Sequence, residues 1–98
     1  MNRKEIIKAE KELEDKLQEV YHLAGKIAVA LVKETMRKNK SLIAFYMAMG
    51  SYHFEDKDGN HIYGDDKPSF EKFNDFMNKY CVDLGIWGED ITITRNDL

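Results

Sequence analysis

Three histidines, His22, His53 and His61, are the first candidates for metal binding or acid–base chemistry. No two of them stand four residues apart, the spacing that puts two ligands of one metal ion on the same face of a helix. A two-residue hairpin turn at Asp58-Gly59 would place His61 opposite Asp56, and not beside His53. The sequence therefore predicts no metal site and does not bring two histidines together.

The single cysteine, Cys81, falls late in an expected helix, away from the positive end that activates a catalytic thiol. One cysteine forms no internal disulfide and no cysteine-based zinc site. An acidic loop begins like a calcium-binding EF-hand at Asp56, but His61 and Lys67 stand where that motif needs glycine and glutamate. Because the glycine-rich phosphate-binding motifs are also absent, we expect neither an enzyme nor a bound cofactor.

Aromatic and basic side chains give an alternative, a site for a small ligand or nucleotide between the sheet and the helices or between subunits. Tyrosine rings stack on planar bases, and cations bind phosphate. The candidates are Tyr46, Tyr52 and Tyr63 for stacking and Lys33, Arg37 and Lys38 for phosphate. Trp87, between Gly85 and Gly88, is a candidate anchor for a partner protein or a lid over the second helix.

The 98 residues carry 15 Lys plus Arg and 18 Asp plus Glu, unevenly placed. Residues 1–49 have ten basic and seven acidic residues, whereas residues 50–98 have five and eleven, so the balances are +3 and −6. Such opposed fields orient self-association or a charged partner. The N-terminal lysines alternate with acids, which disfavours nucleic acid. No run of about 18 apolar residues is present and the first residues do not resemble a signal peptide, so we expect a cytoplasmic protein outside the membrane.

Helix-forming residues without proline extend over residues 3–38. The apolar stripe that defines an expected contact seam comprises Leu13, Leu17, Val20, Ala24, Ile27 and Leu31. Glu10 and Glu34 interrupt it at its two ends, so a long coiled coil is not expected. A straight helix of this length extends about 50 Å, whereas a domain of this size has a radius of gyration near 13 Å. We favour projection of the N-terminal half over a bend at Gly25, and expect Asn39 as a left-handed cap.

Residues 42–98 predict a small sheet and a second helix. Strands are expected at residues 42–54, 61–63 and 90–95, the first with a bulge or break at Gly50 and the last with Ile91 and Ile93 facing inward. The second helix opens at Pro68, and its apolar stripe comprises Phe70, Phe73, Met77, Tyr80 and Leu84. The expected fold is α+β, with order α-β-β-α-β, in which a long N-terminal helix and a second helix pack on a three-stranded, mostly antiparallel sheet of order 2-1-3. Residues 1–98 are expected to form a single domain.

These features favour a small, non-catalytic protein–protein interaction module that self-associates, as a dimer, through its N-terminal helix. An inhibitor or adaptor, including the accessory proteins that mobile elements carry, has this size and composition, and another protein is a further possible partner. The competing hypothesis is the ligand- or nucleotide-binding protein described above.

Overall fold

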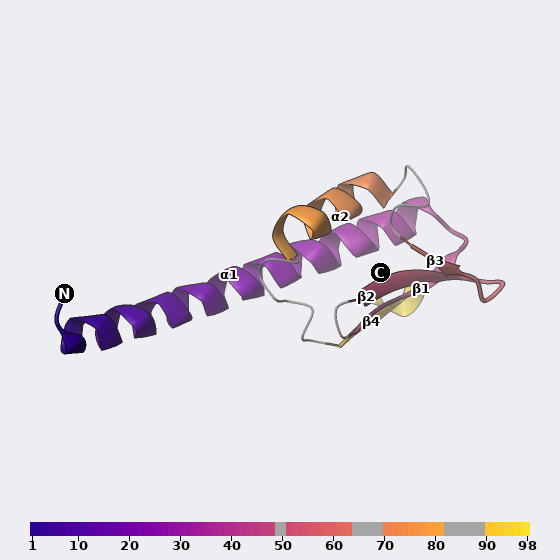
Figure 1. Ribbon diagram of the computed structural model, residues 1–98. Coiled ribbons are helices and arrows are strands. Elements are labelled where there is room, and N and C mark those ends of the chain that lie inside the picture. Colours follow the sequence, from indigo (N-terminus) through magenta and orange to yellow (C-terminus); the bar gives the residue numbers. More distant parts are fainter. Residues whose placement is uncertain (49–50, 64–69, 82–89) are drawn as a thin grey trace.

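The computed structural model describes residues 1–48, 51–63, 70–81 and 90–98 (Figure 1). Its elements, in chain order, are α1 (Arg3–Lys38), β1 (Leu42–Ala48), β2 (Ser51–Asp56), β3 (His61–Ile62), α2 (Glu71–Phe76), a π-helical segment (Met77–Cys81), β4 (Ile91–Thr94) and a 3-10 turn (Arg95–Asp97). The α+β class and the long N-terminal helix are confirmed.

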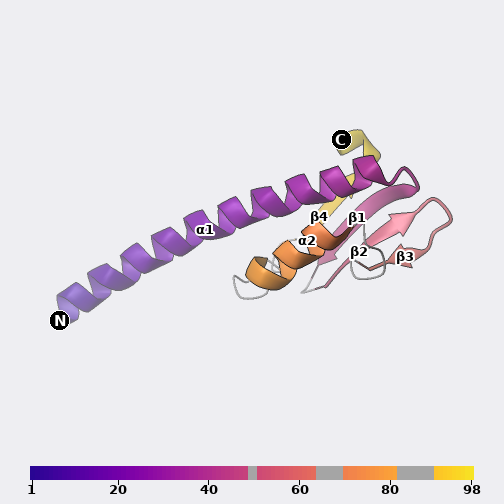
Figure 2. The ribbon, with the colours of Figure 1, turned by 90° about the horizontal axis from the view of Figure 1, so that it is seen from above.

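Helix α1 runs without interruption through Gly25 and projects beyond the rest of the molecule (Figures 1 and 2). Its side chains become buried only from Ala24 onward, so the N-terminal half extends into solvent. The molecule accordingly measures 59 × 24 × 20 Å, with a radius of gyration of 16.6 Å. That value exceeds the roughly 13 Å of a compact chain of this length because the helix neither bends nor breaks.

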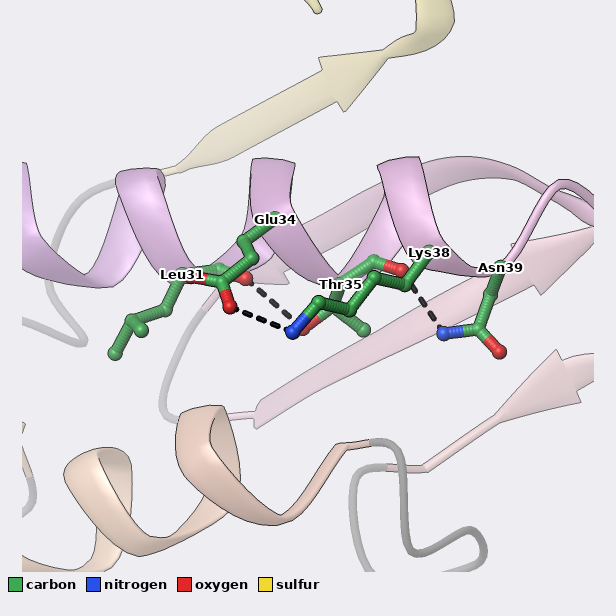
Figure 3. Close-up of polar contacts among 5 residues, drawn as sticks. All are labelled: Leu31, Glu34, Thr35, Lys38 and Asn39. Atoms are coloured by element: carbon green, nitrogen blue, oxygen red, sulfur yellow. Dashed lines mark hydrogen bonds and ion pairs between the residues drawn. The ribbon is translucent and has the colours of Figure 1, made fainter.

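Local hydrogen bonds fix both ends of α1. The Asn2 side-chain oxygen accepts a hydrogen bond from the Glu5 backbone N–H at 2.9 Å, which satisfies one of the free donors of the first turn. At the other end, the side-chain amide of Asn39 donates to the Thr35 carbonyl oxygen at 2.9 Å (Figure 3). Asn39 has φ −122° and ψ 88°, so the expected left-handed cap is wrong. The chain turns directly into β1 there, where the Leu42 N–H donates to the Asn39 carbonyl oxygen.

Within the described residues the sheet has four antiparallel strands, in the order β3-β2-β1-β4, with α1 and α2 over one face (Figure 1). The single strand expected at residues 42–54 is wrong: β1 and β2 form a hairpin in which Ala48 pairs with Ser51. This reversal puts Tyr52 and Phe54 on the helix-covered face with Phe45, whereas one straight strand would separate them. The expected neighbours of that segment, residues 61–62 and 91–94, do flank it on its two sides.

Aromatic rings fill the space between the sheet and the helices. The Phe54 ring lies 4.8 Å from that of Phe70, 5.0 Å from that of Phe45 and 5.8 Å from that of Phe73, measured between centroids. All four side chains are almost fully buried, and Val32 and Met36 of α1 close the cluster. The C-terminal part of α1 is therefore held by the core, and the N-terminal part by its own hydrogen bonds.

The second helix covers the core through Phe70, Phe73 and Met77, as expected. Tyr80 does not continue this stripe: it is 44% exposed and its ring packs against Phe76. Tyr80 lies within the π-helical turn from Met77 to Cys81, which is wider than an α-helical turn. Its side chain therefore leaves the 3.6-residue period on which the expected stripe was based. Leu84 lies outside the described residues. In β4, Ile93 is buried and Ile91 is half-buried, so the inward placement of both is confirmed.

The β2–β3 turn is longer than the two residues expected. Glu55 pairs with His61 and Phe54 with Ile62, which leaves Lys57, Asp58 and Gly59 in the loop. Gly59 has φ +83°, the left-handed conformation that a hairpin bulge requires. The Asp56 carboxylate accepts hydrogen bonds from the backbone N–H groups of Asp58 and Asn60, both at 2.9 Å. The Asp56 side chain therefore holds the loop through hydrogen bonds within the hairpin itself.

Candidate functional site

A row of apolar side chains lies exposed along α1. Leu13 is 58% exposed, Leu23 is 59% exposed, and Val20 and Ile27 are also well exposed. Consecutive members stand three and four residues apart, which keeps them on one face of the helix and sets the pattern of a two-helix contact. We name this row the exposed seam: Ile6, Ala9, Leu13, Lys16, Val20, Leu23, Ile27 and Ala30.

The exposed seam coincides with half of the seam expected from the sequence. Leu13, Val20 and Ile27 belong to both. The other expected row turns toward the body: Ala24 is buried in the core and Leu31 packs against it, while Leu17 is half-exposed. Ala24 is therefore unavailable to a partner, which corrects that part of the expectation.

The structure adds Leu23 and Ala30, which sequence reasoning missed. Their signal was the spacing to Val20 and Ile27, which alternates three and four residues just as the chosen row did. Positions 16, 23 and 30 include the charged Lys16, whereas positions 17, 24 and 31 are all apolar. The sequence therefore favoured the second set as the other half of the seam. Only the packing of Ala24 and Ala28 on the body decides which of the two rows faces solvent.

Charged residues accompany the seam along one edge and change sign midway. A charged residue stands at every seventh position along α1. Each one comes directly before a member of the series Ile6, Leu13, Val20, Ile27 and Glu34. These edge residues are Glu5, Glu12, Glu19, Lys26 and Lys33. The first three are acidic and lie on the projecting half, and the last two are basic and lie beside the body. Helix α1 thus carries an apolar row with an acidic edge at one end and a basic edge at the other.

An intrahelical ion pair closes the seam at its C-terminal end. Lys38 Nζ lies 2.8 Å from Glu34 Oε1 on the next turn (Figure 3). The hydrogen bond from Lys38 and then its positive charge lower the pKa of the Glu34 carboxyl group. In the same stretch the Thr35 hydroxyl donates to the Leu31 carbonyl oxygen at 2.9 Å, so Thr35 is satisfied within α1 although it is buried. The side chains of Glu34, Thr35 and Lys38 are thus paired within the helix itself.

The sheet face away from the helices carries a second group of rings. Tyr46, His53 and His61 follow one another across β1, β2 and β3, with centroids 5.4 Å apart for the first pair and 4.2 Å for the second. Tyr63 lies 6.3 Å from His53. The expectation that the hairpin keeps the two histidines apart is wrong, because the longer loop shifts the pairing by one residue and moves His61 to the face of His53.

Burial of His53, followed by the positive charge of His61, lowers the pKa of the His53 imidazole. Glu55 on the same strand acts in the opposite direction. Within the part of the chain that is described, no group of three or more His, Cys, Asp or Glu side chains could hold a metal ion. Burial and the contact between the two rings thus lower the pKa of one of them, His53, at the sheet surface.

The structure does not gather the residues expected for ligand binding. Tyr52 lies on the helix-covered face, where its hydroxyl donates to Asn74 Oδ1 at 2.7 Å, while Tyr46 and Tyr63 lie on the opposite face. The three cations belong to α1, on the far side of the sheet from Tyr46. These cations are Lys33, Arg37 and Lys38. Lys38 pairs with Glu34, and Arg37 donates a hydrogen bond to the Leu98 carbonyl oxygen at 3.3 Å. Trp87 lies outside the described residues.

Comparison of the chain with protein-family models, with curated proteins and with solved structures finds no match. None of the helices among the described residues has the length and apolar character that crossing a bilayer requires. Among the residues that the structure describes, the exposed seam of α1 is the candidate site, because it combines apolar side chains with ordered charge.

Proposed function

We propose that the protein is a small interaction module that self-associates through the exposed seam of α1. The observation that carries this proposal is that the apolar row continues past the body, with Leu13 and Leu23 each more than half exposed. Burying apolar surface is favourable by roughly 25 cal/mol per Å², and rows of exposed leucine and isoleucine on a soluble chain commonly mark interaction sites. A second helix is the partner whose shape fits such a row.

A dimer also accounts for the stability of the projecting half of α1. In the described part of the structure no side chain of residues 3–20 is buried, and an isolated helix of that length is marginal in water. Packing against another helix stabilises this half by burying one side of it. The activity proposed is binding without catalysis, of the adaptor or inhibitor type, in which the paired helices hold two copies of the sheet.

The test is the molar mass in solution, measured by size-exclusion chromatography with light scattering at several concentrations. We expect twice the chain mass of 11.5 kDa for the unmodified protein and a single chain mass for the variant Leu13→Glu/Leu23→Glu. The matched control, Ile7→Glu/Gln18→Glu, adds the same charge to exposed helix positions off the seam and should remain dimeric. Circular dichroism establishes that each variant is folded. A monomeric unmodified protein at all concentrations would overturn the proposal.

A second candidate function uses the open face of the sheet. Tyr46 is 36% exposed and Tyr63 is 51% exposed, and both lie beside the His53 ring, so a planar ligand such as a nucleotide base has aromatic faces on which to stack. A ligand at 100 times its dissociation constant adds about 2.7 kcal/mol to the free energy of unfolding. A thermal-shift screen of nucleotides should then give a shift that Tyr46→Ala removes. The absence of any shift counts against this candidate.

A further inference from the structure

Resting on the proposed self-association, we infer that the partner is a second copy whose α1 lies antiparallel, with Glu12 opposite the partner's Lys33 and Glu19 opposite the partner's Lys26. Twofold symmetry repeats both pairs, so four oppositely charged pairs flank the exposed seam. The inference follows from the positions of the charges along the edge of the seam.

The edge residues decide the orientation. In an antiparallel helix pair, the positions just before the first apolar position of each seven-residue repeat face their counterparts on the other helix. Acidic residues on the projecting half of one copy then meet basic residues beside the body of the other. Glu12 and Glu19 are exposed, Lys26 is exposed and Lys33 is half-exposed, so all four are available for these contacts.

A parallel pair uses the same seam without this complementarity. There the edge residues face positions five residues further along the partner helix, so that Glu5 meets the partner's Glu10 and Glu19 meets the partner's Ala24. The first contact joins like charges, and the second falls on a side chain that is buried in its own core. The parallel arrangement therefore loses every opposite-charge contact along this edge.

The same charges fix the register. With Glu19 opposite the partner's Lys26, Val20 packs against the partner's Leu23, and Leu13 against the partner's Ala30. A shift of one seven-residue repeat in either direction brings Glu19 against its own copy or Lys26 against its own copy across the symmetry axis. Both shifts place like charges together, which is unfavourable. Lys16 then lies opposite the partner's Ile27, with a side chain long enough to carry its ammonium group to solvent.

The body of the molecule leaves room for this partner. On the C-terminal half of α1, Ala24, Ala28 and Val32 face the core, while Leu23 and Ile27 lie exposed on another side. The projecting half of the partner helix runs along that exposed side. Figure 2 shows α2, β2 and β3 on one side of the C-terminal half of α1, with the C-terminal turn on the other side beside the last turn of the helix. The two bodies then sit at opposite ends of the helix pair.

Charge exchange tests the pairing. Glu19→Lys and Lys26→Glu each turn two attractive contacts into repulsive ones, and each should weaken the dimer by about tenfold or more. The combined variant Glu19→Lys/Lys26→Glu restores opposite charges and should recover the affinity. Lys11→Glu and Glu14→Lys, which change charge on the outward side of the helix, serve as controls and should have little effect. Single variants without effect, or a combined variant no better than its parents, would overturn the inference.

Distance measurement tests the orientation and register directly. Spin labels at Lys8→Cys, in a Cys81→Ser background first shown to retain its dimer mass, are read by double electron–electron resonance. The inferred register places the two labels about 40 Å apart at 1.5 Å per residue. A distance of about 30 or 50 Å would indicate a register shifted by one repeat, and one below about 20 Å a parallel pair; each overturns the inference while keeping the dimer. A monomeric mass without dipolar coupling overturns the proposed function itself.

Discussion

The imidazole rings of His53 and His61 stack on the open face of the sheet, with centroids 4.2 Å and planes 23° apart. The two residues are not direct cross-strand partners, since His61 pairs with Glu55. They are diagonal neighbours on one face of the sheet, and aromatic side chains are large enough to reach each other across such a diagonal. This contact links the geometry of the β2–β3 hairpin to the titration of His53, because partial burial and the charge of His61 both disfavour the imidazolium form.

The first prediction concerns pH. Because the pKa of His53 is lowered in the folded state, the unfolded chain binds the proton at a higher pH than the folded chain does. The free energy of unfolding contributed by this group is fully present above the unfolded pKa of about 6.5 and falls as the pH drops through the folded value. His53→Phe keeps a stacking ring but cannot titrate, so its thermal midpoint should fall less between pH 7.5 and 5.5 than that of the unmodified protein. His22→Gln, which removes an imidazole from an exposed position on α1, is the control for the loss of a histidine.

The hairpin shows how much of this surface the sequence could predict. The Asp58-Gly59 pair correctly indicated a turn. The expected turn length of two residues is wrong, because a two-residue turn and a three-residue loop with a glycine bulge use the same residues. One residue of difference reverses the face of every following side chain, so the contact between His53 and His61 depends on a detail that propensity does not fix.

The second prediction tests the aromatic core. Phe54 contacts the rings of Phe45, Phe70 and Phe73 and is fully buried, so Phe54→Ala leaves a cavity between sheet and helices. We expect the free energy of unfolding to fall by about 3–5 kcal/mol, measured by urea denaturation at fixed chain concentration. Tyr46→Ala, an aromatic truncation on the opposite face, should cost about 1 kcal/mol. Equal losses in the two variants would show that the core is not centred on Phe54.

The sequence predicted which residues form this core, but not that the segment 42–54 is divided into two strands. Phe45, Phe73 and Ile93 were all placed in periodic apolar patterns, and all are buried. The pattern across residues 42–54 indicated a bulge or break at Gly50 but not a reversal of the chain, since its apolar side chains continue on both sides of Gly50. Long-range pairing decides the matter: once Phe54 joins Phe45 on the helix-covered face, the chain must turn between them.

The third prediction concerns the end of α1. The Arg95 guanidinium donates to the Leu42 carbonyl oxygen at 2.6 Å and to the Met36 carbonyl oxygen at 3.2 Å, which joins β4 to the last turn of the helix. Arg95→Ala leaves these carbonyl groups without their charged donor, and we expect a loss of about 1.5–3 kcal/mol in unfolding experiments. Arg37→Ala is the matched control, since that side chain donates to the Leu98 carbonyl oxygen in an exposed hydrogen bond, and should cost about 0.5 kcal/mol. A cost for Arg95→Ala no larger than the control would exclude a capping role.

The fourth prediction compares two glycines under the same substitution. Gly25 lies inside α1, and a Cβ built there meets no atom within 4 Å, so Gly25→Ala should stabilise the protein by about 0.5–1 kcal/mol through the higher helix propensity of alanine. Gly59 also has open space around its Cβ position, but its φ of +83° is strained for any L-residue, so Gly59→Ala should destabilise by about 1 kcal/mol. Urea denaturation of both variants measures the difference. Opposite signs are expected because the backbone conformation, and not the available space, separates the two sites, while two equal signs would contradict that explanation.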